Sequence, residues 1–122
     1  LETYSHGMRQ KLVIAGILLH EPKVLVLDEP MVGLDPKSAR LVKDILQTLA
    51  RRGATVFMCT HILEIAEKLC HRIGIMISGR MIALGSVAEL RSRARQDAGA
   101  GLEDIFLSLT GGQEYSSLLT HL

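Results

Sequence analysis

Runs of aliphatic residues alternate along this chain with amphipathic stretches. Residues 24–27 are four aliphatic side chains in a row, a pattern typical of a parallel-sheet strand that is buried on both faces. Pro30 ends this strand because proline cannot donate a hydrogen bond to the sheet ladder. Residues 55–59 predict a second buried strand. Each strand is followed by polar residues, namely Asp28 and Glu29 after the first, and Thr60 and His61 after the second.

Two long amphipathic stretches in the first half predict helices. The first begins at Ser5, a good N-cap residue, and runs to about residue 20, where Glu21 and Pro22 end it. The second begins at Asp35, with Pro36 in the first helical position, and ends at Arg52 and Gly53. Its predicted buried stripe consists of Leu41, Ile45, Leu46 and Leu49.

Shorter elements are predicted in the second half. Residues 62–70 predict a helix, and residues 72–78 and 81–84 predict a hairpin with a short glycine turn. A capping box at residues 86–89 opens another short helix. A linker at residues 91–101 then leads to an amphipathic helix at residues 102–109. The order of strands and helices predicts an α/β fold.

Composition limits the class of protein. A chain of 122 residues forms at most one domain. Its 48% hydrophobic and 3% aromatic content favours aliphatic α/β packing over a β-sandwich. A net charge of +1 gives no general attraction to nucleic acid or to an anionic membrane, and residues 91–95 are interpreted as a solvated helix face. Two cysteines indicate a reducing, cytosolic setting.

The candidate chemistry is ambiguous when each motif is taken alone. Asp28 and Glu29 at a strand's carboxyl end suit a hydrated metal and an activated water, or they are simply a solvated strand end. Ser5 and Gly7 at a helix start suit an anion site or an ordinary cap. The possible zinc ligands are Cys59, His61, Cys70 and His71. Their spacing does not match that of a zinc site, so the cysteines are predicted to be buried and reduced.

The order of these motifs resembles the ATPase subunit of ABC transporters over residues 1–90. A Ser-x-Gly helix start is followed by a strand ending Asp-Glu-Pro, then Gly-Leu-Asp-Pro, then a strand ending Thr-His. Tyr4-Ser5-His6-Gly7-Met8 resembles the family signature Leu-Ser-Gly-Gly-Gln and departs from it at Tyr4, His6 and Met8. This variant and residues 102–111 are similar to the drug and antibiotic exporter branch.

The resemblance implies a role for each matching residue, with ATP and Mg²⁺ as cofactors. Asp28 would hold Mg²⁺ through water, and Glu29 would act as general base on the attacking water. His61 would be the switch histidine at the γ-phosphate, and Asp35 would couple the two subunits. Ser5 and Gly7 would contact the ATP held by the partner subunit.

The resemblance also implies the assembly. Two ATPase subunits would pack head to tail with two-fold or pseudo-two-fold symmetry and would drive an integral membrane permease. No nucleic acid partner is expected, and the location would be cytoplasmic, peripheral on the inner face of the cell membrane. Residues 1–90 would be the C-terminal portion of the ATPase domain, and residues 91–122 a linker and C-terminal helical extension.

One motif of the family does not occur in the sequence. The phosphate loop Gly-x-x-x-x-Gly-Lys-Ser/Thr, which cradles the nucleotide phosphates, is absent from the 122 residues. In the family this loop lies upstream of the signature. The chain is therefore expected to be the C-terminal part of an ABC ATPase and to be inactive by itself. The alternatives are a soluble ABC-type ATPase acting on ribosomes or DNA, and a non-hydrolysing interaction domain.

Overall fold

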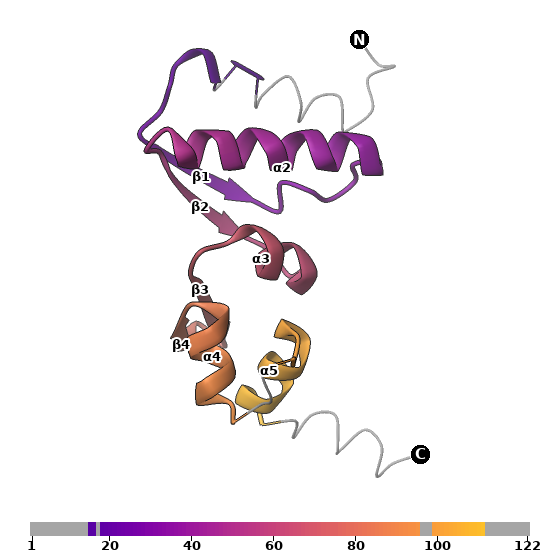
Figure 1. The fold of residues 1–122 in the computed structure, drawn as a ribbon, viewed down its shortest axis with the longest axis vertical. Helices are drawn as coiled ribbons and strands as arrows, with labels where there is room; N and C mark the ends of the chain where they lie inside the picture. The colour runs from indigo at the N-terminus through magenta and orange to yellow at the C-terminus, as the bar shows by residue number, and fades with distance from the viewer. Residues whose placement is uncertain (1–14, 17, 96–98, 112–122) are drawn as a thin grey trace. The chain divides into compact units, whose positions relative to one another are not determined.

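The computed structural model describes residues 15–16, 18–95 and 99–111. It divides the chain into two compact units, Leu1–His61 and Ile62–Leu122, which are coloured from indigo to rose and from rose to yellow in Figure 1. Each unit has its own two-stranded sheet. The predicted boundary between residues 1–90 and 91–122 stays a prediction.

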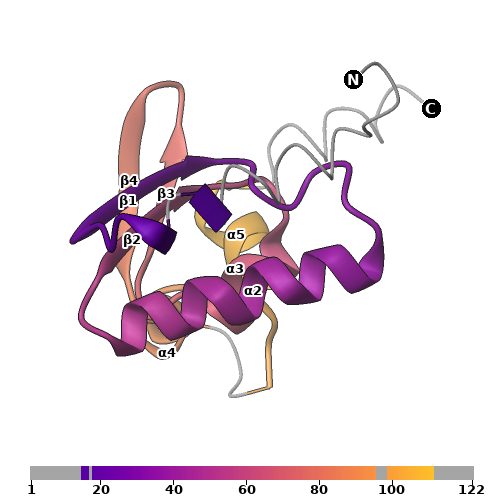
Figure 2. The same ribbon diagram turned by 90° about the horizontal axis from the view of Figure 1, so that it is seen from above.

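The first unit is a strand–helix–strand arrangement. Strand β1 (Val24–Asp28) and strand β2 (Thr55–Cys59) pair in parallel, with Val24 opposite Thr55 and Asp28 opposite Cys59. Helix α2 (Pro36–Arg51) connects them and runs alongside the sheet in both ribbon views (Figures 1 and 2). Parallel strands need a crossover of this kind. The parallel register brings the carboxyl ends of both strands to the same edge.

The limits of α2 are those that the sequence predicts. The Asp35 side chain accepts a hydrogen bond from the Ser38 backbone N–H, and Pro36 occupies the first helical position. The chain leaves the helix at Arg52 and turns at Gly53, whose φ of 97° suits glycine. The buried residues are Ser38, Val42, Leu46 and Leu49. Leu41 was expected in this stripe, but it is 48% exposed because it lies one position off the row that contains Val42 and Leu46.

The strands of the first unit are less buried than predicted. Leu25 is 6% exposed, whereas Val24 is 63% and Val26 is 68% exposed, and Phe57 on β2 is 57% exposed. Alternate residues of a strand point to opposite faces, and among the described residues only one face of this sheet has α2 against it. The expectation of burial on both faces is therefore wrong for this part of the chain. Cys59, which was predicted to be buried, is also exposed.

Within residues 62–95 and 99–111, the second unit has a hairpin and three short helices. Helix α3 (Leu63–Leu69) precedes strand β3 (Ile73–Ile77), which pairs antiparallel with β4 (Arg80–Gly85). Ser78 and Gly79 both have positive φ, as a tight hairpin turn requires. Helices α4 (Val87–Arg93) and α5 (Leu102–Leu109) follow. Their shared core consists of Ala66, Ile75, Ala83, Leu90, Ala94, Leu102 and Ile105.

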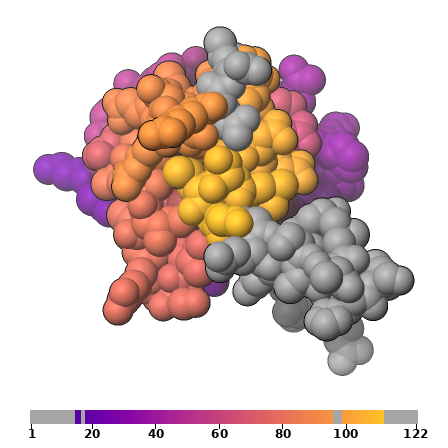
Figure 3. All heavy atoms as spheres, turned by 90° about the horizontal axis from the view of Figure 1, so that it is seen from below, coloured from indigo at the N-terminus to yellow at the C-terminus, as the bar shows by residue number. Residues whose placement is uncertain are grey.

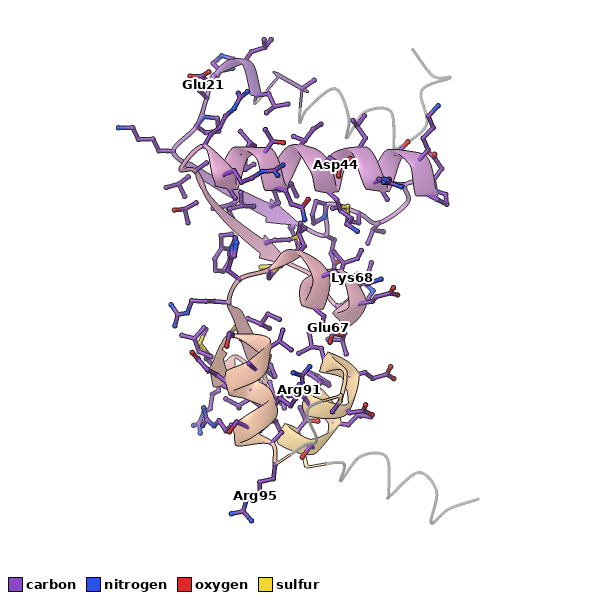
Figure 4. The ribbon with its side chains drawn as sticks, in the orientation of Figure 1. Glu21, Asp44, Glu67, Lys68, Arg91 and Arg95 are labelled. Atoms are coloured by element: carbon purple, nitrogen blue, oxygen red, sulfur yellow. The ribbon has the colours of Figure 1, made fainter. Side chains whose placement is uncertain are left out.

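Polar contacts cap the helices of the second unit and join neighbouring segments. Ser86 and Glu89 form the predicted capping box of α4. The Glu67 carboxylate on α3 accepts the backbone N–H of Leu102 at 3.2 Å, and Figure 4 shows Glu67 on the side of α3 that is directed to α5. Arg91 donates from Nε to the Ala100 carbonyl at 2.9 Å. Figure 3 shows the resulting surface, with α4 in orange and α5 in yellow side by side.

The α/β class is confirmed in the described residues, where α2 packs against the parallel pair of β1 and β2. The helix at residues 102–109 has the predicted limits, and its Ile105 is completely buried. In the part of the chain that the structure describes, no helix is both long enough and apolar enough to span a membrane.

Candidate active site

The candidate site lies at the carboxyl ends of β1 and β2. Strand β1 ends at Asp28, and the next residue, Glu29, adopts a φ of 46°. This left-handed conformation is unfavourable for a residue with a side chain. The backbone N–H of Glu29 donates to the Cys59 carbonyl at 2.8 Å, and Pro30 behind it is fully buried. The backbone at Glu29 is thus fixed against the end of β2.

The Glu29 side chain lies against the two residues that follow β2. Its Oε1 accepts the backbone N–H of His61 at 3.0 Å and lies 2.5 Å from the ring Nδ1 of His61. Its Oε2 accepts the hydroxyl of Thr60 at 3.1 Å. Each carboxylate oxygen is therefore held by a different residue. The structure brings together Glu29 and His61, the two residues to which the family resemblance gave catalytic roles.

These hydrogen bonds change the acidity of Glu29. The side-chain hydrogen bond from His61 holds the pKa of Glu29 below its usual value of 4.5, against the opposing effect of partial burial. The backbone N–H of His61 and the hydroxyl of Thr60 lower the pKa of Glu29 further. The carboxylate is therefore ionised at neutral pH, which is the form that can accept a proton.

The contact also defines the proton on the His61 ring. An ionised carboxylate only accepts hydrogen bonds, so Nδ1 of His61 must carry the hydrogen that lies between the two groups. The His61 side chain is 79% exposed, whereas that of Glu29 is 31% exposed. The histidine ring can therefore meet a ligand from solvent while the carboxylate beside it stays partly shielded.

Asp28 suits a magnesium ion that also has nucleotide ligands. It is exposed and directly precedes Glu29 on the same strand end. Among residues 15–16, 18–95 and 99–111, no three His, Cys, Asp or Glu side chains are grouped so that they could hold a metal by themselves. Mg²⁺ takes one or two protein carboxylates and completes its shell with water and phosphate oxygens. One exposed carboxylate at this edge fits that donor set.

Asp35 is engaged with its own helix. Its Oδ2 accepts the backbone N–H of Ser38 at 3.2 Å, and its Oδ1 accepts the Ser38 hydroxyl. Ser38 is 3% exposed. The N-cap of α2 therefore includes a buried hydroxyl that fixes the Asp35 carboxylate.

The described residues do not include every predicted site residue, and they show two contacts that the sequence did not predict. Ser5 and Gly7 lie outside the described residues. Sequence reasoning assigned no partner role to Thr60 or Ser38. The Asp-x-x-Ser spacing of an N-cap and its N3 residue signals the Ser38 contact. For Thr60 the only sequence signal is its place between the end of β2 and His61.

Known proteins are similar to this chain in sequence. A family model described as "AAA domain, putative AbiEii toxin, Type IV TA system" matches residues 1–67, more than half of the chain. The fluoroquinolones export ATP-binding protein of Mycobacterium tuberculosis (strain CDC 1551 / Oshkosh) is 42% identical over 88% of this chain and 38% of its own length. The linearmycin resistance ATP-binding protein LnrL of Bacillus subtilis (strain 168) is 41% identical over 80% of this chain and 31% of its own.

A solved structure agrees with these sequence matches. It is titled "Structure of ATP binding subunit of ABC transporter" and superposes with a TM-score of 0.82 at 33% identity, over 89% of this chain and 45% of that one. The chain belongs to the AAA domain family of that model and to the ABC transporter ATP-binding proteins. The chain spans less than half the length of each of these relatives.

Proposed function

We propose that this ABC ATPase chain supplies the hydrolytic residues of an exporter's ATP-hydrolysing subunit. The observation that carries the proposal is the contact of Glu29 with His61 at the carboxyl ends of neighbouring parallel strands. The phosphate loop is not among the 122 residues, so the proposed enzyme includes a segment that contains it. We use the term complete subunit for this chain joined to such a segment.

In the proposed mechanism Glu29 is the general base. Its ionised carboxylate takes a proton from a water molecule as the water oxygen attacks the γ-phosphorus of ATP. The bond from that phosphorus to the bridging β–γ oxygen breaks, which releases ADP and phosphate. Asp28 would hold Mg²⁺ through water, and the bound ion supplies charge neutralisation at the phosphate oxygens.

His61 would change partners when ATP binds. In the structure, Nδ1–H of His61 is directed to Glu29 Oε1. A contact of the same ring with the γ-phosphate needs a hydrogen on the ring nitrogen that faces the phosphate. Rotation of the exposed ring toward the nucleotide would supply this donor and would leave room at Oε1 for the attacking water, beside the backbone N–H of His61.

The remaining predicted residues belong to the proposed assembly. Ser5 and Gly7 would close on ATP held by a second ATPase subunit, and Asp35 would couple the two subunits across a head-to-tail dimer. An integral membrane permease would receive the resulting motion, with the ATPase peripheral on the cytoplasmic face of the membrane. The words "export" and "resistance" in the relatives' names support an exporter over other transporter types.

The test is Mg²⁺-dependent phosphate release by the complete subunit. Glu29→Gln should lower kcat by about 10²-fold or more, the usual contribution of a general base, and leave the Kd for ATP unchanged. Glu21→Gln is a matched control, because Glu21 also has positive φ and is exposed, yet it precedes β1. Wild-type turnover in Glu29→Gln would overturn the proposal.

Phosphate release by the wild-type complete subunit also distinguishes the exporter from the two alternative functions. An interaction domain would release no phosphate in its wild-type form. A soluble ATPase that acts on ribosomes or DNA would hydrolyse ATP and would be stimulated by those nucleic acid partners rather than by a membrane subunit. Copurification with a multi-span membrane protein, together with stimulation by it, is the result expected for an exporter.

A further inference from the structure

Thr60 makes a contact with the candidate base that is independent of His61. Its hydroxyl donates to Glu29 Oε2 at 3.1 Å, while both hydrogen bonds from His61 go to Oε1. Thr60 is half-buried and His61 is exposed. Oε2 is therefore held by a short side chain in a partly enclosed position, whereas Oε1 is held by a backbone N–H and by an exposed ring.

The backbone strengthens the link between Glu29 and Thr60. Glu29 donates its N–H to the carbonyl of Cys59, the residue directly before Thr60. The left-handed φ of 46° at Glu29 persists only when neighbouring contacts fix it. With the backbone N–H of His61 on Oε1 as well, Glu29 is attached at three points to the consecutive residues 59–61.

A base that activates water needs one oxygen directed to that water and a side chain that does not rotate away. If His61 leaves Oε1 for the nucleotide, its side-chain hold on Glu29 ends. The Thr60 hydroxyl still donates to Oε2, and the backbone N–H of His61 still donates to Oε1. A carboxylate that is held through one oxygen keeps its other oxygen directed to the water. This orientation lowers the entropic cost of reaching the reactive geometry.

We propose that Thr60 is a positioning residue for Glu29, and that its hydroxyl fixes Oε2 while the attacking water takes the place of the His61 ring at Oε1, beside the backbone N–H of His61. This inference rests on the proposed function, because it requires Glu29 to be the base. The bland alternative is that Thr60 only stabilises the end of β2. The two differ in what they predict for catalysis in the presence and absence of the Glu29 carboxylate.

Thr60→Val removes the hydroxyl and keeps the shape and β-branching of the side chain. In the complete subunit we expect kcat to fall about ten-fold, as a lost hydrogen bond to a charged group implies, with the KM for ATP unchanged. Thr60→Ser retains the hydroxyl and should restore most of kcat. Urea midpoints measured for both variants report whether each one folds as the wild type does.

A double-mutant cycle separates positioning from structural support. In the Glu29→Gln background, Thr60→Val should leave the residual rate unchanged, because no base remains to be positioned. A ten-fold fall of that residual rate would overturn the inference, as would wild-type kcat in Thr60→Val or failure of Thr60→Ser to restore activity. Wild-type turnover in Glu29→Gln alone would instead refute the proposed function on which the inference rests. Should Thr60→Val not fold, the Thr60→Ser and Thr60→Ala pair takes its place in the same cycle.

Discussion

Glu29 and His61 are joined by two hydrogen bonds, from the backbone N–H at 3.0 Å and from the ring at 2.5 Å, and both end on the same carboxylate oxygen. The two residues are separated by a strand and a helix in sequence, and the parallel pairing of β1 with β2 brings them together. This contact makes Glu29 a stronger acid in the folded chain than in the unfolded chain.

Folding stability should therefore depend on Glu29 in acid. Because its folded-state pKa lies below the usual 4.5, the stabilisation that Glu29 provides is fully present above pH 4.5. It is lost as the pH falls through the folded-state pKa. In nucleotide-free complete subunit, the difference in urea midpoint between wild type and Glu29→Gln should be constant near neutral pH and shrink below pH 4.5. A difference that grows in acid would contradict the assigned direction of the shift.

Helix α2 offers a test of the core with one substitution at two positions. Leu46 is 2% exposed and Leu41 is 48% exposed on the same helix. Leu46→Ala should lower the free energy of unfolding of the complete subunit by about 2–5 kcal/mol, the usual cost of such a cavity. Leu41→Ala should cost less than about 1 kcal/mol. Equal losses in urea denaturation would show that the assigned buried face is wrong.

Glu67 should stabilise the C-terminal helix from a distance. Its carboxylate accepts the first backbone N–H of α5, which has no side-chain cap of its own. Glu67→Ala should cost about 1 kcal/mol, as the loss of a helix cap does, and Glu67→Gln should retain part of this because its amide oxygen also accepts. Hydrogen exchange at α5 in the complete subunit measures the local effect. Glu64→Ala, an exposed change on the same helix, is the control and should leave α5 unaffected.

The sequence-based predictions succeed where the signal is local. The Asp35-Pro36 start of α2, the Ser86–Glu89 capping box and the limits of α5 follow from cap chemistry and side-chain periodicity. The meeting of Glu29 and His61 follows from a general property of parallel sheets, whose strands end at a common edge.

What the sequence does not reveal depends on long-range contacts. An aliphatic run predicts a strand, but the burial of Val26 or Phe57 depends on which elements cover each face. The Glu67 to Leu102 cap joins residues 35 positions apart, and no periodicity encodes it. The Thr60 hydroxyl contact requires knowledge of the register between β1 and β2.

The chain by itself should bind ATP weakly or not at all. Its sequence lacks the Gly-x-x-x-x-Gly-Lys-Ser/Thr loop whose backbone N–H groups and lysine hold the phosphates. Exposed Val24, Val26 and Phe57 on a two-stranded sheet also favour aggregation. Calorimetric titration with ATP and sedimentation of the 122-residue chain measure both properties. Micromolar ATP binding together with a cooperative urea transition would contradict this expectation.

The central claim is that Glu29 serves hydrolysis and not nucleotide binding. Its most direct test is a single-turnover, rapid-quench measurement with radiolabelled ATP and Mg²⁺ on the complete subunit. The account predicts that Glu29→Gln binds ATP as the wild type does and retains it unhydrolysed, while Glu21→Gln releases phosphate at the wild-type rate. Phosphate release by Glu29→Gln at the wild-type rate would contradict it.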